Sequence, residues 1–400
     1  MSPLSNILDR FQPSAISEIF SLTNRLKEEG RDIIDLSIGE PDFPTPDHVK
    51  QAAMEAIAAD FTRYTPVDGT RALKSAISAK FKRDNGLAYG IDQIVVDAGA
   101  KPMLFHAMQA MLNPDDEVIL PVPCWTSYIG MVQLSGAKPV TVPCPQDRQF
   151  KLQADDLEKA ITERTRLILL NSPSNPTGAA YNADEMKALT DVLMRHPKIW
   201  IIADDIYEHI VFDNFIFATP SSVEPSLYDR TLTINGVSKA YSMTGWRIGY
   251  AGGPKNLISG IVKIMSQSVG NPCSISQVAA IAALEGPQDY LGQRAALFKE
   301  RRDFLLQGLN SINGLSCHAP EGAFYLFPSC AGLIGGTTPE GLKITNSTAL
   351  ASYLLEASGI AVVPGAAFEY DPNIRLSYAT SMDNLKIACD RLEQACHQIT

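Results

Sequence analysis

The sequence lacks the short motifs that identify several large classes of enzyme. It contains no GxGxxG or GxxxxGK[ST] loop for a nucleotide, no HExxH zinc motif and no GxSxG motif around a nucleophilic serine. Its seven cysteines are odd in number and never spaced as CxxC, so neither a disulfide framework nor a zinc site is expected. We therefore predict reduced cysteines and no bound metal.

Positive charge is also scarce. The chain carries 34 Lys and Arg against 44 Asp and Glu, a net charge of −10, and no basic run exceeds two residues. This balance argues against a general nucleic-acid-binding protein, whose affinity depends on neutralising phosphates. No apolar run reaches the ~18 residues that a membrane span needs, and the N-terminal stretch MSPLSNILDRFQPSA has no secretory-signal pattern. We expect a cytoplasmic protein with neither a membrane nor a nucleic-acid partner.

The composition is that of a large globular protein. The chain has 400 residues, of which 45% are hydrophobic and 20% charged, enough for more than one packed unit. Short apolar runs alternate with amphipathic stretches such as DEMKALTDVLMRH at 184–196. We expect the apolar runs to form buried strands at 93–99, 117–123, 138–143, 166–173, 199–205 and 231–237. This alternation predicts an α/β fold whose mostly parallel sheet is covered by helices.

The C-terminal part of the chain has a different pattern. A long helix is predicted at 293–309, and it is followed by β-rich segments at 322–328 and 359–365 and by a closing amphipathic helix. We expect three divisions: an N-terminal arm with part of a small domain (1–48), a large ligand-binding domain (49–290), and a connecting helix with the rest of a smaller α+β domain (291–400).

Polar or aromatic residues follow five of the predicted strands. Ligands of open parallel sheets bind outside the carboxyl ends of the strands, so these residues are expected to lie close together. They are Gly99, Ala100 and Lys101; Trp125; Asn175; Asp204 with Tyr207; and Ser238 with Lys239. This set of groups suits a flat, phosphorylated molecule that contains nitrogen. It comprises backbone amides, an indole, a side-chain amide, a carboxylate, a phenol and an amine.

The segment NGVSKAYSMTGWRIGYAGGP at 235–254 places two cations, Lys239 and Arg247, among small and apolar residues. A surface lysine at the start of a helix and a snorkelling arginine would also explain them. However, a lysine is rarely buried unless a partner or a reaction requires it. The position of Lys239 after a predicted strand favours a functional role.

Seven segments, in this order along the chain, resemble those of a known family. They are SIGEPDFPTP (37–46), RYTPVDG (63–69), AGAK (98–101), NSPSNPTGA (171–179), DDIYE (204–208), SKAYSMTGWRIGY (238–250) and IRLSYATS (374–381). Over essentially the whole chain, the sequence is similar to the class I aminotransferases of the aspartate-aminotransferase fold (fold type I), which use pyridoxal 5′-phosphate. GAK, PCWTSY and MTGWRIGY are closest to the bacterial aspartate/prephenate branch. The resemblance implies ping-pong transfer of an amino group from an L-amino acid to a 2-oxo acid such as 2-oxoglutarate.

The resemblance also implies a role for each strand-end residue. Lys239 would form the Schiff base with the cofactor and then shuttle a proton, and Asp204 would keep the pyridine nitrogen protonated. Tyr207 and Asn175 would hydrogen-bond the phenolic oxygen of the cofactor, while Trp125 would cover its ring. The phosphate would be held by Arg247, by Ser238 and by the backbone at Gly99, Ala100 and Lys101.

Further residues are implied for the substrate and for assembly. Arg375 would bind the substrate α-carboxylate as a bidentate pair, and the backbone at Gly39 would approach the same group. Trp125, Asn175 and Lys101 would also contact the substrate. Tyr64 would reach the phosphate in a neighbouring subunit, so a homodimer with shared active sites is expected.

The sequence departs from that branch near its N-terminus. The segment FQPSAIS has Gln12 where a basic residue is usual and Ile16 where threonine is usual, while Ser14 and Lys101 are kept. The resemblance implies that Gln12, Ser14 and Ile16 line the distal part of the substrate pocket, where losing a charge-assisted contact should weaken the preference for a second carboxylate. We expect the amino donor to be aspartate or a neutral or aromatic amino acid.

Two alternatives share the same cofactor-binding residues. One is a pyridoxal-phosphate lyase, cyclising synthase or decarboxylase of the same fold. The other is a non-catalytic regulator that binds the cofactor. Products formed from an added amino acid would separate them: transamination yields a 2-oxo acid, elimination yields ammonia and pyruvate, and a regulator yields nothing.

Overall fold

The structure is a computed structural model that describes residues 4–11 and 15–400, with the backbone alone at 15–18 and 20. Its centre is a seven-stranded sheet in the order β2-β8-β7-β6-β5-β3-β4. The strands are β2 (Ile94–Asp97), β3 (Glu117–Val122), β4 (Lys138–Pro143), β5 (Thr165–Asn171), β6 (Trp200–Asp204), β7 (Thr231–Gly236) and β8 (Gly249–Gly252). Only β8 runs antiparallel to its neighbours, β2 and β7. The predicted α/β class with a mostly parallel sheet is confirmed.

Alternation along the strands explains why both faces of this sheet are apolar. On β5, Leu167 and Leu169 belong to one hydrophobic cluster, whereas Ile168 and Leu170 belong to another on the opposite face. Successive side chains of a strand point to opposite faces, so a continuous apolar run needs cover on both sides.

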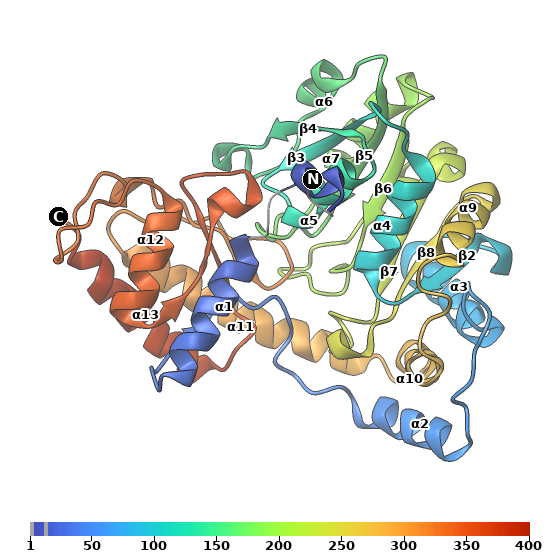
Figure 1. Cartoon of the computed structure of the whole chain (residues 1–400), viewed down its shortest axis with the longest axis horizontal. Helices are drawn as coiled ribbons and strands as arrows, with labels where there is room; N and C mark the ends of the chain where they lie inside the picture. Colours follow the sequence, from blue (N-terminus) through green and yellow to red (C-terminus); the bar gives the residue numbers. More distant parts are fainter. Residues whose placement is uncertain (1–3, 12–14) are drawn as a thin grey trace.

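Helices provide this cover (Figure 1). They are α2 (Asp47–Ala58), α3 (Arg71–Asn85), α4 (Ala100–Met111), α5 (Thr126–Leu134), α6 (Ala154–Ala160), α7 (Ala183–Arg195), α8 (Pro220–Val223), α9 (Lys255–Met265) and α10 (Ser274–Glu285). The first cluster includes side chains of α4, α5 and α9, and the second includes side chains of α6 and α7.

The strand β8 has no counterpart among the predicted apolar runs. Its sequence, GYAG, is short and rich in glycine, which weakens any strand signal. The glycine is needed because neighbours approach closely: a Cβ atom at Gly252 would lie 2.9 Å from Cγ of Tyr89. Packing rather than propensity therefore forms this strand.

The C-terminal part builds a second hydrophobic core. Its elements are α11 (Asp289–Ser311), β9 (Tyr325–Leu326), α12 (Ser347–Tyr353), β10 (Ile360–Ala361), β11 (Val363–Pro364), β12 (Ile374–Ser377) and α13 (Met382–His397). β11, β12 and β9 form an antiparallel sheet. The expected β-rich segments at 322–328 and 359–365 thus contain strands of only two residues each.

The N-terminal segment joins this second core. β1 (Ile34–Asp35) pairs in parallel with β10, and α1 (Ala15–Glu28) contacts β11. Figure 1 shows α11 extending from the C-terminal helices toward α10. Shorter turns of helix are η1 (Asn6–Arg10), η2 (Ile91–Gln93), η3 (Gln146–Arg148), η4 (Pro225–Arg230), η5 (Thr244–Trp246), η6 (Ala331–Leu333), η7 (Leu354–Ser358) and η8 (Gly365–Phe368). Within the described residues, no helix has the length and apolarity to span a membrane.

Candidate active site

A cavity of about 530 Å³ opens at the carboxyl ends of the parallel strands, next to the start of α4. Most residues singled out from the sequence line it: Gly39, Ala100, Lys101, Trp125, Asn175, Asp204, Tyr207, Ser238, Lys239, Arg247 and Arg375. Gly99 lies at its edge as the N-cap of α4. The fold thus brings together singled-out residues that are up to 336 positions apart in the chain, from Gly39 to Arg375.

Besides Gly99, four of the sequence-predicted residues are not among those lining the cavity. The side chain of Tyr64 is 98% exposed on the outer surface. Gln12 and Ser14 lie outside the described residues, and the side chain of Ile16 is not described. The proposed distal part of the substrate pocket therefore rests on the sequence.

Lys239 follows β7 and is partly buried at the cavity wall. Its Nζ donates a hydrogen bond of 2.6 Å to the carbonyl oxygen of Gly39. Burial lowers the pKa of the ammonium group to about 8, and the positive charges of Arg375 and Arg247 add to this effect. A larger fraction of the amine is therefore neutral, and hence nucleophilic, than in an exposed lysine.

Asp204 ends β6 with its carboxylate buried at the cavity wall. Burial raises the pKa of this group to about 6, although a 2.6 Å hydrogen bond from the hydroxyl of Tyr128 opposes the rise. The backbone carbonyl of Asp204 accepts a hydrogen bond from Asn171 at the end of β5, which joins the two strand ends. The next residue, Asp205, is buried but does not line the cavity.

The start of α4 forms a cradle for an anion. Gly99 has φ +111°, a conformation that favours glycine, and a Cβ atom there would lie 2.9 Å from Cζ of Arg247. Backbone N–H groups at the start of a helix attract anions, and the guanidinium of Arg247 adds a full positive charge. Lys101 completes the group, with Nζ 5.2 Å from the ring centre of Trp125. Burial and the nearby Arg247 lower the pKa of Lys101.

Arg375 approaches the cavity from β12 and is only 2% exposed. Its Nη atoms donate to Oδ1 of Asn175 at 3.0 Å and to the carbonyl oxygen of Ser37 at 2.6 Å. Its Nε has no hydrogen-bond partner among the described residues, and no described carboxylate forms an ion pair with it. A buried guanidinium whose charge is not neutralised favours binding of an anionic ligand.

Two tyrosines and an asparagine in the cavity wall were missed from the sequence: Tyr128, Asn171 and Tyr325. Tyr128 lies one helical turn after Trp125, a spacing that could have suggested it. Asn171 ends β5 and could have been found by the same strand-end rule as Asp204. The hydroxyl of Tyr325, 2.8 Å from that of Tyr207, comes from β9, and no local pattern connects the two residues.

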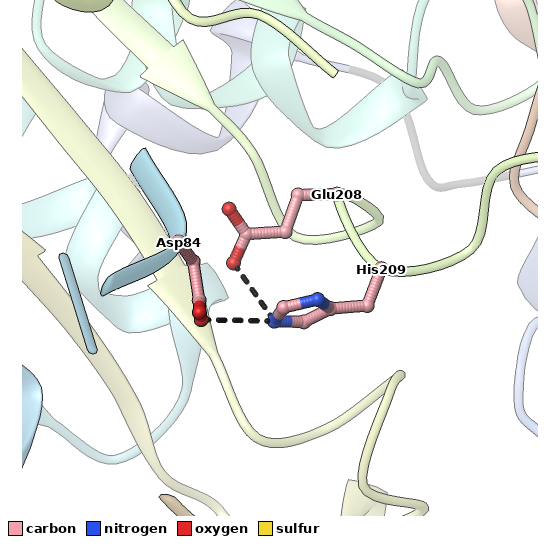
Figure 2. Close-up of side chains that lie close together, drawn as sticks. All are labelled: Asp84, Glu208 and His209. Carbon is pink, nitrogen blue, oxygen red and sulfur yellow. Dashed lines mark ion pairs between the residues drawn. The ribbon is translucent and has the colours of Figure 1, made fainter. Parts of the chain in front are cut away.

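A charged cluster lies behind the Asp204–Tyr207 segment. Figure 2 shows Asp84 and Glu208 facing one nitrogen, Nε2, of His209, at 3.5 Å and 3.3 Å. The ammonium of Lys80, which is fully buried, also pairs with Glu208. Although three such groups could hold a metal ion, Lys80 already supplies a cation to the carboxylate. We assign the cluster a structural role in holding the segment that follows β6.

The fold and the donor set define a class of enzyme. An amine with a depressed pKa, a buried carboxylate and a glycine-lined cradle with a guanidinium match the aldehyde, the ring nitrogen and the phosphate of pyridoxal 5′-phosphate. The residues therefore fit this cofactor, and the site is that of a pyridoxal-phosphate enzyme of fold type I.

Comparison with known proteins identifies the family. A sequence model of the family "Aminotransferase class I and II" matches residues 31–392. The chain is 53% identical to an aspartate aminotransferase of Rhizobium meliloti, covering 98% of this chain and 97% of that protein. It is also 53% identical to an aspartate/prephenate aminotransferase of Cereibacter sphaeroides, covering 99% of each.

Solved structures agree with this result. The structure matches the crystal structure of the aspartate aminotransferase from Rhizobium meliloti with a TM-score of 0.97, at 52% identity over 100% of both chains. It matches the aspartate aminotransferase from Thermus thermophilus with maleate with a TM-score of 0.92, at 38% identity over 99% and 100% of the two chains.

The chain belongs to the class I and II aminotransferase family. It is a pyridoxal-phosphate-dependent aminotransferase that acts on an amino acid and a 2-oxo acid. The family and the cofactor predicted from the sequence are confirmed. The lyase and regulator alternatives are not favoured by these relatives.

Proposed function

We propose that Lys239 and Asp204 carry the chemistry of this transamination. The supporting observation is that one cavity shifts two pKa values toward neutrality, that of Lys239 down to about 8 and that of Asp204 up to about 6. The bound cofactor supplies an aldehyde that condenses with amines and a ring that draws electron density from the substrate Cα. Asp204 holds the proton on the ring nitrogen, and Nζ of Lys239 accepts and returns the Cα proton.

The other residues bind and orient. Arg247, Ser238 and the start of α4, from Gly99 to Lys101, hold the phosphate. Tyr207 and Asn175 bind the phenolic oxygen, and Trp125 covers the ring and excludes water. Arg375 holds the substrate carboxylate in a bidentate pair, with Asn175 and the backbone at Gly39 beside it.

Lys239 can be tested directly as the point of attachment. Borohydride reduction of the holoenzyme, followed by peptide mass analysis, should place the pyridoxyl group on Lys239. Lys239→Ala should abolish turnover in a protein that still folds. A pyridoxyl group on Lys101 instead would contradict the assignment, because Lys101 is the other lysine of the cavity.

We propose aspartate as the first candidate donor, with 2-oxoglutarate or another oxo acid as acceptor. The named activities of the relatives support aspartate and prephenate-type substrates. Gln12 and Ile16 replace a cation and a hydroxyl in the N-terminal segment, so neutral and aromatic donors should be accepted comparatively well. Lys101 and Ser14 keep part of the polar character of this pocket.

A panel of kcat/KM values tests this specificity. It covers aspartate, glutamate, phenylalanine, alanine and methionine as donors and prephenate as acceptor, for the wild type and for Gln12→Lys combined with Ile16→Thr. The double variant should gain preference for aspartate. A wild type that already prefers aspartate by several orders of magnitude, with no change in the variant, would exclude these positions from the pocket.

We propose that the active unit is a homodimer with shared sites. Tyr64 is 98% exposed, and Met54, Ile57 and Phe61 are exposed on or just after α2, as expected for a surface that another subunit covers. The segment from Tyr64 to Thr70 is held against α10 although the side chain of Tyr64 is exposed. The side-chain oxygen of Gln277 accepts a hydrogen bond of 2.7 Å from the backbone N–H of Thr70. Tyr64 would then reach the phosphate of the partner.

Complementation between two inactive chains tests this arrangement. Co-refolded Tyr64→Ala and Lys239→Ala chains should regain activity, because one site of the mixed dimer combines the intact lysine of one chain with the intact tyrosine of the other. Each variant alone serves as the control. A mixture as inactive as its components would show that the two residues act within one chain.

The cavity also supports a division of the chain into 1–48, 49–290 and 291–400. Its walls come from all three parts, through Gly39, the strand ends of the large sheet, and Tyr325 with Arg375. Relative movement of the parts would open and close the site.

We further propose a cytoplasmic location, where the seven free cysteines stay reduced.

A further inference from the structure

Tyr128 lies behind two residues that we assign to the cofactor. Its hydroxyl donates a 2.6 Å hydrogen bond to Oδ2 of Asp204. Its ring meets that of Trp125 edge to face, with centroids 5.4 Å apart and planes at 89°. The side chain is 2% exposed and belongs to the hydrophobic cluster under α4 and α5. Tyr128 thus has a fixed orientation toward a buried carboxylate.

The hydrogen bond from Tyr128 is the short one at this carboxylate. In the part of the chain that the structure describes, Oδ1 of Asp204 accepts only a long bond, of 3.4 Å, from the backbone N–H of Ile206. The ammonium of Lys239 also favours the ionised form of Asp204. The other titratable groups nearby are Tyr207 and Asp205, which face Asp204, and Cys124, which lies beside Tyr128. Since burial raises the pKa of Tyr128 well above its ordinary value, the phenol stays a neutral donor at all working pH values.

A neutral donor has an advantage over a cation at this position. A lysine or arginine would neutralise Asp204 and weaken its attraction for a second positive group, whereas a phenol stabilises the negative charge without cancelling it. We propose that Tyr128 is a positioning residue that acts through Asp204, keeping the carboxylate ionised and oriented for the protonated ring nitrogen of the cofactor. This inference rests on the proposed role of Asp204.

The experiment measures binding rather than turnover. Pyridoxal 5′-phosphate and its analogue with CH in place of the ring nitrogen are titrated into the cofactor-free protein from pH 6 to pH 9, with tryptophan fluorescence as the signal. Both probes carry the aldehyde and the phosphate, so the ratio of their affinities isolates the contact to Asp204. This ratio is measured within each protein and is insensitive to a loss of folded fraction.

Tyr128→Phe removes the hydroxyl and keeps the ring under Trp125. Losing a hydrogen bond to a charged group raises the pH at which Asp204 ionises by about one unit or more. The preference for the nitrogen-containing probe should therefore fall about fivefold or more at pH 6, where the ionised fraction of Asp204 drops from about one half to about one tenth, and approach the wild-type value by pH 9. Tyr353→Phe, which removes a buried hydroxyl bonded to the carbonyl of Ala395, is the matched control and should leave the ratio unchanged.

The outcomes distinguish a failure of the role proposed for Tyr128 from a failure of the role proposed for Asp204. If Tyr128→Phe weakens both probes equally, or leaves the ratio unchanged at every pH, Tyr128 does not act through Asp204. Asp204→Asn should abolish the preference for the nitrogen-containing probe altogether. If it retains the preference, the role of Asp204 is wrong and the inference falls with it.

Discussion

Asp204→Asn should stabilise the cofactor-free protein while removing its activity. The carboxylate is buried, and its pKa lies at about 6 rather than at the ordinary 3.8. A shift of about two pH units, at about 1.4 kcal/mol each, means that ionised Asp204 costs the folded state about 3 kcal/mol. The asparagine carries no charge, keeps an oxygen to accept from Tyr128, and lines a cavity where water can accept from its amide.

The pH dependence of this gain follows from linkage. In the unfolded chain the carboxyl group loses its proton near pH 4, but in the folded protein it keeps the proton until about pH 6. The stability that Asp204 contributes is therefore present below pH 4 and lost as the pH rises through about 6. The variant should gain about half of the full difference at pH 5 and all of it at pH 8.

Urea unfolding of both proteins at pH 5 and pH 8, at one protein concentration and without cofactor, measures the difference. A variant that is no more stable at pH 8, or whose gain does not depend on pH, would refute the reasoning. In the activity assay, Asp204→Asn should lose several kcal/mol of transition-state stabilisation. Asp205→Asn, which does not change the cavity wall, should lose far less.

Three further substitutions test other parts of the structure. Gly99→Ala places a Cβ atom against Arg247 and strains a backbone at φ +111°, so equilibrium dialysis should show weaker cofactor binding. Lys80→Met removes the buried ammonium that pairs with Glu208 and leaves that carboxylate with His209 as its remaining ionic partner, which should cost up to about 3–5 kcal/mol in urea unfolding. Arg375→Lys loses the planar fork, so KM for the amino acid should rise about tenfold or more while affinity for the cofactor stays unchanged. Unchanged values in these assays would contradict each argument in turn.

Much of the large sheet could be predicted because its strands are buried on both faces. Continuous apolar runs such as those of β5 and β6 leave little choice of structure, and the six predicted runs all contain strands. β8 could not be predicted in this way, because its glycines reflect the close approach of Tyr89 and Ala100 from elsewhere in the chain. The helix α1 was likewise not predicted from the sequence.

Site residues could be predicted from the sequence where the sheet topology fixes their position. They could not be predicted where only packing between distant segments brings them together. The ends of parallel strands meet at one edge, so Asp204 and Lys239 could be assigned to a common site from their positions alone. Arg375 required the family resemblance, since an arginine on a strand is ordinarily a solvated edge residue. Tyr325 had no signal, because its contact with Tyr207 joins β9 to the segment after β6.

The two arginines of the cavity connect substrate binding to the basicity of Lys239. Both Arg375 and Arg247 lower the pKa of Lys239, in addition to its burial. An amino acid whose carboxylate pairs with Arg375 would cancel part of that positive charge and raise the pKa of Lys239. The amine would therefore be most nucleophilic in the cofactor-free protein, where it attaches the cofactor, and a stronger base once substrate is held and has released it, when a proton must be taken from Cα. Under the proposed assignment, the guanidinium that would bind the substrate carboxylate would also adjust the basicity of Lys239 for proton transfer.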